Sequence, residues 1–200
     1  MNHFKKLMAA AALASSSVLA QAADDTFIGL TYGKTDNKIT KSSQLDKNLD
    51  NPNVNGVIGS EGTWGLRLGQ QNDVGRYYVT YDNVSGSHNG VRLRQENLLG
   101  SYDLFFPAAT GTKLFLGGSA GTTKLSQESK GYSRDTNYGY AFGVQAGLLQ
   151  QVSDNMSMEL GYRYLRTNAS VEMVPHGARK AGSMDLSSTG QMYVSANYAF

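Results

Sequence analysis

The sequence predicts an all-β protein, an eight-stranded antiparallel transmembrane up-and-down β-barrel that follows an N-terminal signal peptide. Three observations predict this fold class: an apolar leader, segments of about ten residues in which apolar and polar residues alternate, and connections that are alternately long and short. No segment after the leader approaches the roughly 20 apolar residues of a membrane-spanning helix. Insertion into a membrane would therefore require a closed barrel of strands.

The N-terminus has the features of a secretory signal peptide. Two lysines precede the apolar run 7–20, and the motif A-Q-A, which ends at Ala22, fits a small-x-small cleavage site. We therefore expect residues 1–22 to be removed. Residues 23–200 would then form one barrel domain.

The composition argues against some classes of partner. The chain carries 18 basic and 16 acidic residues, and loss of the two leader lysines leaves 16 of each. A neutral chain has no general electrostatic attraction to nucleic acid, so we expect no such partner. The chain has no cysteine, 23 glycines and 12 tyrosines, which suits many short strands without disulfides.

The first three alternating segments are regular. Each has one apolar face and one face of polar or small residues, as a strand with one face in lipid requires. The apolar faces are Ile28, Leu30 and Tyr32 in 24–34, Trp64, Leu66 and Leu68 in 61–71, and Tyr77, Val79 and Tyr81 in 76–82.

The next two expected strands, 91–104 and 112–123, have faces that the sequence leaves open. In the first, the parity of the apolar residues also places Arg92, Arg94 and Glu96 on the same face. Either these three charged residues rise above the bilayer, or a bulge near Glu96 exchanges the two faces. The second is rich in glycine, and its faces are ambiguous.

The last three segments alternate regularly again. Their apolar faces are Tyr138, Tyr140, Phe142, Val144, Ala146 and Leu148 in 138–150, Met156, Met158, Leu160, Tyr162 and Tyr164 in 156–167, and Met192, Val194, Ala196, Tyr198 and Phe200 in 191–200.

The connections between these segments alternate in length. Long polar loops at one end and short turns at the other are typical of outer-membrane barrels, whereas a long structureless loop is uncommon in a compact soluble domain. The expected outer loops are 35–60, 83–90, 124–137 and 168–187, and the expected turns are 72–75, 105–111 and 151–155.

Three motifs resemble the small eight-stranded outer-membrane barrels of the OmpA/OmpX and opacity-protein type: F-I-G-L-T-Y-G at 27–33, E-L-G-Y-R-Y at 159–164 and the terminal S-A-N-Y-A-F. The resemblance implies the outer membrane of a Gram-negative bacterium and contact with its lipid and lipopolysaccharide. It also implies a C-terminal signal that the barrel-assembly machinery reads during insertion. The signal residues would be Val194, Ala196, Tyr198 and Phe200.

Aromatic residues of the apolar faces are candidates for the interfacial belts of a membrane protein, since their rings are amphipathic. The candidates are Trp64, Tyr81, Tyr138, Tyr162 and Tyr164.

Three charged residues have the parity of the lumen: Arg67, Glu159 and Arg163. Eight strands leave a lumen that side chains just fill, and a charge there is costly without a partner. We therefore expect Glu159 to form a structural ion-pair plug with at least one of the two arginines. In barrels of the OmpA type, a comparable cluster is associated with gating.

The sequence predicts the function less directly than the fold, because small barrels share architecture far more than activity. The sequence favours a non-enzymatic structural or surface-interaction role in adhesion or the envelope, through loops 35–60, 124–137 and 168–187, which could contact an extracellular ligand. The alternative is a narrow porin-like channel for small solutes.

A lipid A-modifying barrel enzyme is a third and weaker candidate. The mature chain has two histidines, His88 and His176, both in predicted loops, and no His-x-Ser pair lies in an expected strand. Two distant histidines without cysteine offer no metal-ligand spacing. We therefore expect no catalytic residue, cofactor or metal.

Overall fold

The computed structural model describes residues 25–42, 61–88, 91–129, 133–174 and 182–200, and every regular element in them is a β-strand. None of these residues belongs to a helix that could span a membrane. The predicted signal peptide lies outside the described residues. The strands are β1 (Asp25–Lys41), β2 (Glu61–Gln71), β3 (Gly75–His88), β4 (Val91–Ala109), β5 (Thr112–Ser129), β6 (Asp135–Gln151), β7 (Met156–Thr167), β8 (Ser170–Met173) and β9 (Gly182–Ala199).

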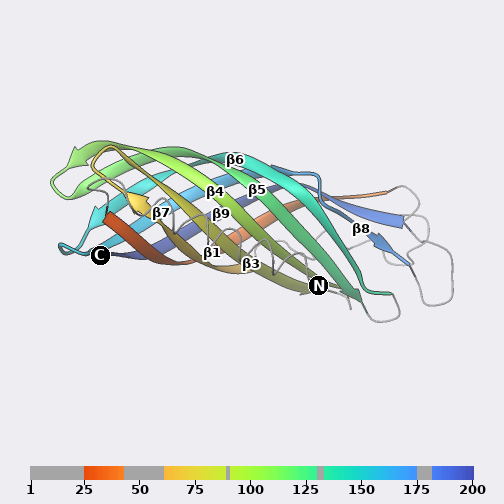
Figure 1. Cartoon of the computed structure of the whole chain (residues 1–200). Coiled ribbons are helices and arrows are strands. Elements are labelled where there is room, and N and C mark those ends of the chain that lie inside the picture. The colour runs from red at the N-terminus through yellow and green to blue at the C-terminus, as the bar shows by residue number, and fades with distance from the viewer. Residues whose placement is uncertain (1–24, 43–60, 89–90, 130–132, 175–181) are drawn as a thin grey trace.

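The strands close into an antiparallel barrel (Figure 1). Each strand from β1 to β7 pairs with its neighbour in the chain, and β9 pairs with both β7 and β1. The short β8 pairs with the first residues of β9, just beyond the point where the β7–β9 pairing ends at Arg166 and Ser188. The wall therefore has eight strands, and the predicted fold class is confirmed.

The two ends of the barrel differ. The three short turns and the C-terminus lie at one end, and β8 lies at the other (Figure 1). In outer-membrane barrels the short turns are periplasmic and the longer connections are extracellular. The C-terminal end is therefore the periplasmic end, and β8 marks the extracellular one.

The strands extend further outward than the sequence predicts. The predicted loop 35–60 begins inside β1, and 83–90 is strand up to His88. The predicted loop 124–137 contains the end of β5 and the start of β6, while 168–187 contains β8 and the start of β9. These ladders continue above the bilayer, where the outer face meets water and no longer needs apolar residues, so the alternation that signals a strand is lost.

The predicted turn 105–111 is also mostly strand, since β4 continues to Ala109. The pairing of β4 with β5 shifts register between Pro107 and Ala109, an irregularity that accommodates a residue without a backbone N–H. The tight turn itself contains Gly111, whose φ of 73° favours glycine.

The faces of β4 and β5 are now decided. The pairing between them is continuous from Val91 to Pro107, so there is no bulge near Glu96. Leu104 and Tyr102 point outward in the bilayer, and the outward positions of the same strand continue to Arg94 and Arg92 beyond it. Of the two alternatives that the sequence left open, the rise above the bilayer is correct.

The outward side carries a continuous apolar belt, and the inward side is packed. Large apolar side chains are exposed on every long strand, which is the pattern of a surface in contact with lipid. On β5, Leu114 and Leu116 are exposed while Phe115 between them is buried. The same alternation runs through β7, whose residues are exposed and buried in turn from Met156 to Thr167.

The adjacent glycines of β5 give a test of these faces. A Cβ on Gly117 would lie 2.0 Å from Asp103 Oδ1 and 2.2 Å from the Tyr102 carbonyl oxygen, whereas a Cβ on Gly118 would meet nothing closer than 3.7 Å. We expect Gly117→Val to destabilise the barrel by about 1–3 kcal/mol, because backbone must move. Gly118→Val should change stability by less than about 0.5 kcal/mol.

Urea unfolding of the two variants in detergent measures this difference. Equal stability of Gly117→Val and Gly118→Val would mean that the inward and outward faces of β5 are assigned incorrectly.

Candidate functional site

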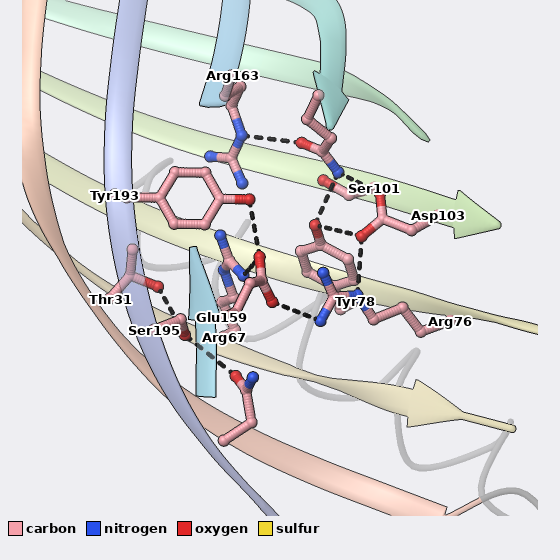
Figure 2. A network of polar contacts seen from close by, with 12 residues as sticks. Thr31, Arg67, Arg76, Tyr78, Ser101, Asp103, Glu159, Arg163, Tyr193 and Ser195 are labelled. Carbon is pink, nitrogen blue, oxygen red and sulfur yellow. Dashed lines mark hydrogen bonds and ion pairs between the residues drawn. The ribbon is translucent and has the colours of Figure 1, made fainter. Parts of the chain in front are cut away.

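The lumen contains a buried network of three arginines and three carboxylates, and Figure 2 shows all of them except Asp82. The arginines come from β2, β3 and β7, and the carboxylates come from β3, β4 and β7. All six side chains are at most 1% exposed. The cluster is electrically neutral, as a desolvated set of charges must nearly be. Its members are Arg67, Arg76, Arg163, Asp82, Asp103 and Glu159.

Glu159 of β7 is the centre of this network. Its Oε1 accepts a hydrogen bond from Arg67 Nη1 at 2.8 Å, and its Oε2 accepts one from Arg76 Nη1 at 2.7 Å. The Tyr193 hydroxyl donates a third, at 2.8 Å, to Oε1. Two cations from β2 and β3 thus hold one carboxylate from β7, and the contacts span the lumen.

Asp103 of β4 completes the charge balance beside Arg76. Arg76 Nε donates to Asp103 Oδ2 at 2.8 Å, and the Tyr78 hydroxyl donates to the same oxygen at 3.0 Å. Gln145 of β6 donates to Asp103 Oδ1 at 2.6 Å. Arg76 therefore carries two charge-assisted contacts, one to each of two carboxylates.

Arg163 belongs to a second ion pair. Its Nη1 lies 2.7 Å from Asp82 Oδ2, and its Nε donates to Gln145 Oε1 at 2.9 Å. Gln145 thereby connects the two pairs. The ring of Tyr193 also lies between two guanidinium groups, with Arg67 Cζ at 4.5 Å and Arg163 Cζ at 5.6 Å from its centroid.

The structure places the three lumen candidates of the sequence in this network but pairs them differently. Arg67 contacts Glu159, whereas Arg163 contacts Asp82 and makes no ion pair with Glu159. Sequence reasoning missed Arg76, Asp82 and Asp103. Strand parity could have found Asp82, which alternates with the outward tyrosines of β3. Arg76 and Asp103 could have been found in the same way, because each also alternates with outward residues of its strand.

Apolar layers close the lumen on both sides of the network. On the periplasmic side, a pocket of about 450 Å³ ends at Phe105 and Leu149, which pack with Phe115. Toward the extracellular end, six apolar side chains are at most 1% exposed and fill the interior: Val84, Leu93, Leu125, Val171, Met184 and Leu186. The described lumen is thus filled by side chains along its length.

The aromatic belt candidates and the C-terminal signal candidates lie on the outer surface. Tyr81 is half-buried, and its hydroxyl donates to Glu96 Oε1 at 2.7 Å. Trp64 packs edge-on against this tyrosine. The other outward candidates are Tyr138, Tyr162, Tyr164, Val194, Ala196, Tyr198 and Phe200, all of them exposed.

A second group of charges lies on the outer face, directly above the apolar belt, on β4, on β5 and just before β6. We call it the rim patch and define it as Arg92, Arg94, Glu96, Lys124, Glu128 and Arg134. It contains four cations and two carboxylates. A pocket of about 470 Å³ on this surface is lined by Arg92, Arg94, Glu128, Arg134 and the hydroxyl groups of Ser85, Ser87 and Ser126.

The rim patch is held together by ion pairs. Lys124 Nζ lies 2.6 Å from Glu96 Oε2, and Arg94 Nη2 lies 3.2 Å from Glu96 Oε1. Arg134 Nη1 lies 2.9 Å from Glu128 Oε1. Because the cations outnumber the carboxylates, the patch can bind an anion in addition to these internal pairs.

Of the two histidines of the enzymatic alternative, only His88 lies within a described strand. His88 is the last residue of β3 and not a loop residue, and His176 lies outside the described part of the chain. Among the described residues, no group of three or more histidine, aspartate or glutamate side chains is arranged to hold a metal ion.

Comparison with solved structures places the chain among outer-membrane barrels. It is 56% identical to outer membrane protein H (OprH) from P. aeruginosa over 88% of this chain and 99% of that one, with a TM-score of 0.57. Neisserial surface protein A is 16% identical, with 88% and 97% covered and a TM-score of 0.61. OprG from Pseudomonas aeruginosa is 14% identical, with 89% and 96% covered and a TM-score of 0.61.

The two neighbours of low identity show the fold alone. No protein-family model and no curated protein matches the chain. Together with the closed barrel and its apolar belt, the structural matches establish an integral protein of the Gram-negative outer membrane.

Removal of the central carboxylate tests the network. We expect Glu159→Ala to destabilise the barrel by about 3–5 kcal/mol, because two desolvated guanidinium groups lose their shared partner. Glu128→Ala, on the exposed rim, should cost less than about 0.5 kcal/mol. Urea unfolding in detergent measures both changes, and equal stability of the two variants would contradict a buried role for Glu159.

Proposed function

The chain belongs to the family of outer membrane protein H, and from this premise we propose that it is a closed, non-enzymatic barrel that binds lipopolysaccharide at its outer rim. One observation carries the proposal: the rim patch lies on the same outward face as the apolar belt and directly above it. A protein in the outer membrane meets the phosphate-bearing headgroups of lipopolysaccharide at this level. Clusters of basic residues next to the hydrocarbon attract such headgroups.

The chemistry of the rim patch fits a phosphorylated glycolipid. Guanidinium groups match phosphate oxygens with paired N–H donors, and Arg94 is about half exposed at the side chain. The serine hydroxyls of the same pocket could donate to sugar or phosphate oxygens. Lys124, Glu128 and Arg134 come from the segment 124–137, one of the three segments in which the sequence predicts surface contacts. Of the other two, 35–60 is described only up to residue 42, and 168–187 lacks residues 175–181.

The filled lumen favours this role over the narrow channel. A conducting pore needs a continuous path for water, and the network of Glu159 lies between apolar layers at both ends. The filled lumen therefore supports the proposed role at the outer surface, in which the protein stabilises the envelope by contact with its lipid.

Loss of rim charge tests the binding of lipopolysaccharide. We expect the double variant Arg92→Gln/Arg94→Gln to bind lipopolysaccharide roughly 30-fold more weakly, since each basic residue near a membrane surface contributes about 1 kcal/mol. Titration of the detergent-solubilised protein with lipopolysaccharide measures the change. Lys113→Gln, at the periplasmic end, is the matched control and should bind as the wild type does. Unchanged binding by the double variant would reject the proposal.

Planar-bilayer recording tests the closed lumen. We expect no steady current from the wild-type protein, because the charges of the lumen are neutralised in pairs and apolar side chains exclude water above and below them. The same preparation must show the two-state, heat-dependent gel migration of a folded barrel. A steady open-channel current from folded protein would favour the porin-like alternative.

A further inference from the structure

The apolar belt is interrupted by a hollow on the lipid-facing side of β4, β5, β6 and β7. This hollow, which we call the belt groove, has a volume of about 700 Å³. Small residues on β4 and β5 form its floor: Gly100, Gly118 and Ala120. Bulky side chains form its walls: Tyr102, Phe142, Val144 and Tyr164.

The packing of the barrel does not require the two floor glycines. A Cβ on Gly100 would meet no atom closer than 3.8 Å, and one on Gly118 none closer than 3.7 Å. Gly117, by contrast, faces inward, where a Cβ would collide with Asp103. Glycine within a strand weakens it and often marks a place where another molecule approaches closely. The absence of side chains at the two floor glycines therefore keeps the hollow on the outer surface open.

One end of the belt groove is cationic. The outward residues Gly100, Ala120, Phe142 and Arg166 are paired in one row across the four strands. Arg166 is exposed near the extracellular end of β7, and it lines the groove together with Tyr164 of the same strand. The belt groove thus ends at a guanidinium group on its extracellular side.

The belt groove is also continuous with the rim patch. The outward positions of β5 run from Gly118 and Ala120 in the groove through Thr122 to Lys124 in the patch. Lys124 lies four residues further along the strand than Ala120, a distance of roughly 13 Å. A single lipid could therefore place a chain on the groove floor and its phosphates between Arg166 and Lys124.

We infer that the belt groove holds one acyl chain of lipid A, with Arg166 as a partner of its phosphate. The inference rests on the proposed function for its ligand and adds the position of the apolar part. A second copy of the chain fits less well. In a membrane, the axis of a two-fold dimer runs along the bilayer normal, so a dimer through the groove would bring two Arg166 side chains together at one depth.

Filling the groove tests this inference. The full chain in detergent is titrated with lipid A and, separately, with its fully deacylated sugar phosphate, and bound ligand is counted by native mass spectrometry. We expect Gly100→Val/Gly118→Val to bind lipid A at least tenfold more weakly and the deacylated sugar as the wild type does. Arg166→Gln should weaken binding of both ligands several-fold.

The matched control is Gly62→Val, the same change on β2, where the added Cβ has only an ordinary contact of 3.6 Å with the Tyr32 hydroxyl. It should bind both ligands normally. Heat-dependent gel migration confirms that each variant is folded. If the double variant does not fold, Arg166→Gln still tests the inference, because it leaves the groove floor unchanged.

Three outcomes would overturn the inference: normal lipid A binding by the groove-filled variant, equal loss of lipid A and deacylated sugar, or a wild-type dimer that the filled variant lacks. The Arg92→Gln/Arg94→Gln variant separates the two proposals. If it loses both ligands while the filled variant binds normally, rim binding stands and the groove inference fails. If it binds normally while the filled variant loses lipid A, the groove stands and the rim proposal fails.

Discussion

A carboxylate in the middle of an eight-stranded barrel constrains everything around it. Glu159 cannot be hydrated there, so its two oxygens are satisfied by Arg67 and Arg76 at 2.8 and 2.7 Å. The second guanidinium would leave excess positive charge, which Asp103 neutralises. Because these residues come from β2, β3, β4 and β7, one charge balance links separate parts of the wall and fills the space that a solute would need.

On the outer surface of the barrel, the environment of the side chains changes with height along the strands. Within the bilayer the outward positions are apolar, and just above it the same strands carry Arg94, Lys124 and their neighbours. The ladder of hydrogen bonds is continuous through both zones. A rigid wall that extends beyond the hydrocarbon can therefore present an apolar groove and a cationic rim to different parts of one lipid.

The continuation of the strands above the bilayer also explains where prediction from the sequence stopped. Alternation identified six of the eight wall strands together with their faces, because lipid on one side and a packed lumen on the other impose opposite requirements on successive residues. The sequence also predicted β4 and β5 as strands but left their faces open. Above the bilayer both faces tolerate polar side chains, so the outer parts of β1, β3, β5, β6 and β9 have the composition of loops. Only the pairing of neighbouring strands shows that they continue.

By itself, the sequence determined the fold class, the eight wall strands and the inward parity of Arg67, Glu159 and Arg163, because each of these depends on local alternation. The tertiary structure alone decided the partners. Glu159 pairs with Arg76, which is 83 residues away, and Arg163 pairs with Asp82 at a separation of 81. Such contacts depend on the register and stagger of the closed barrel. Parity shows which side of the wall a residue faces, but not which residues of other strands lie at the same height in the lumen.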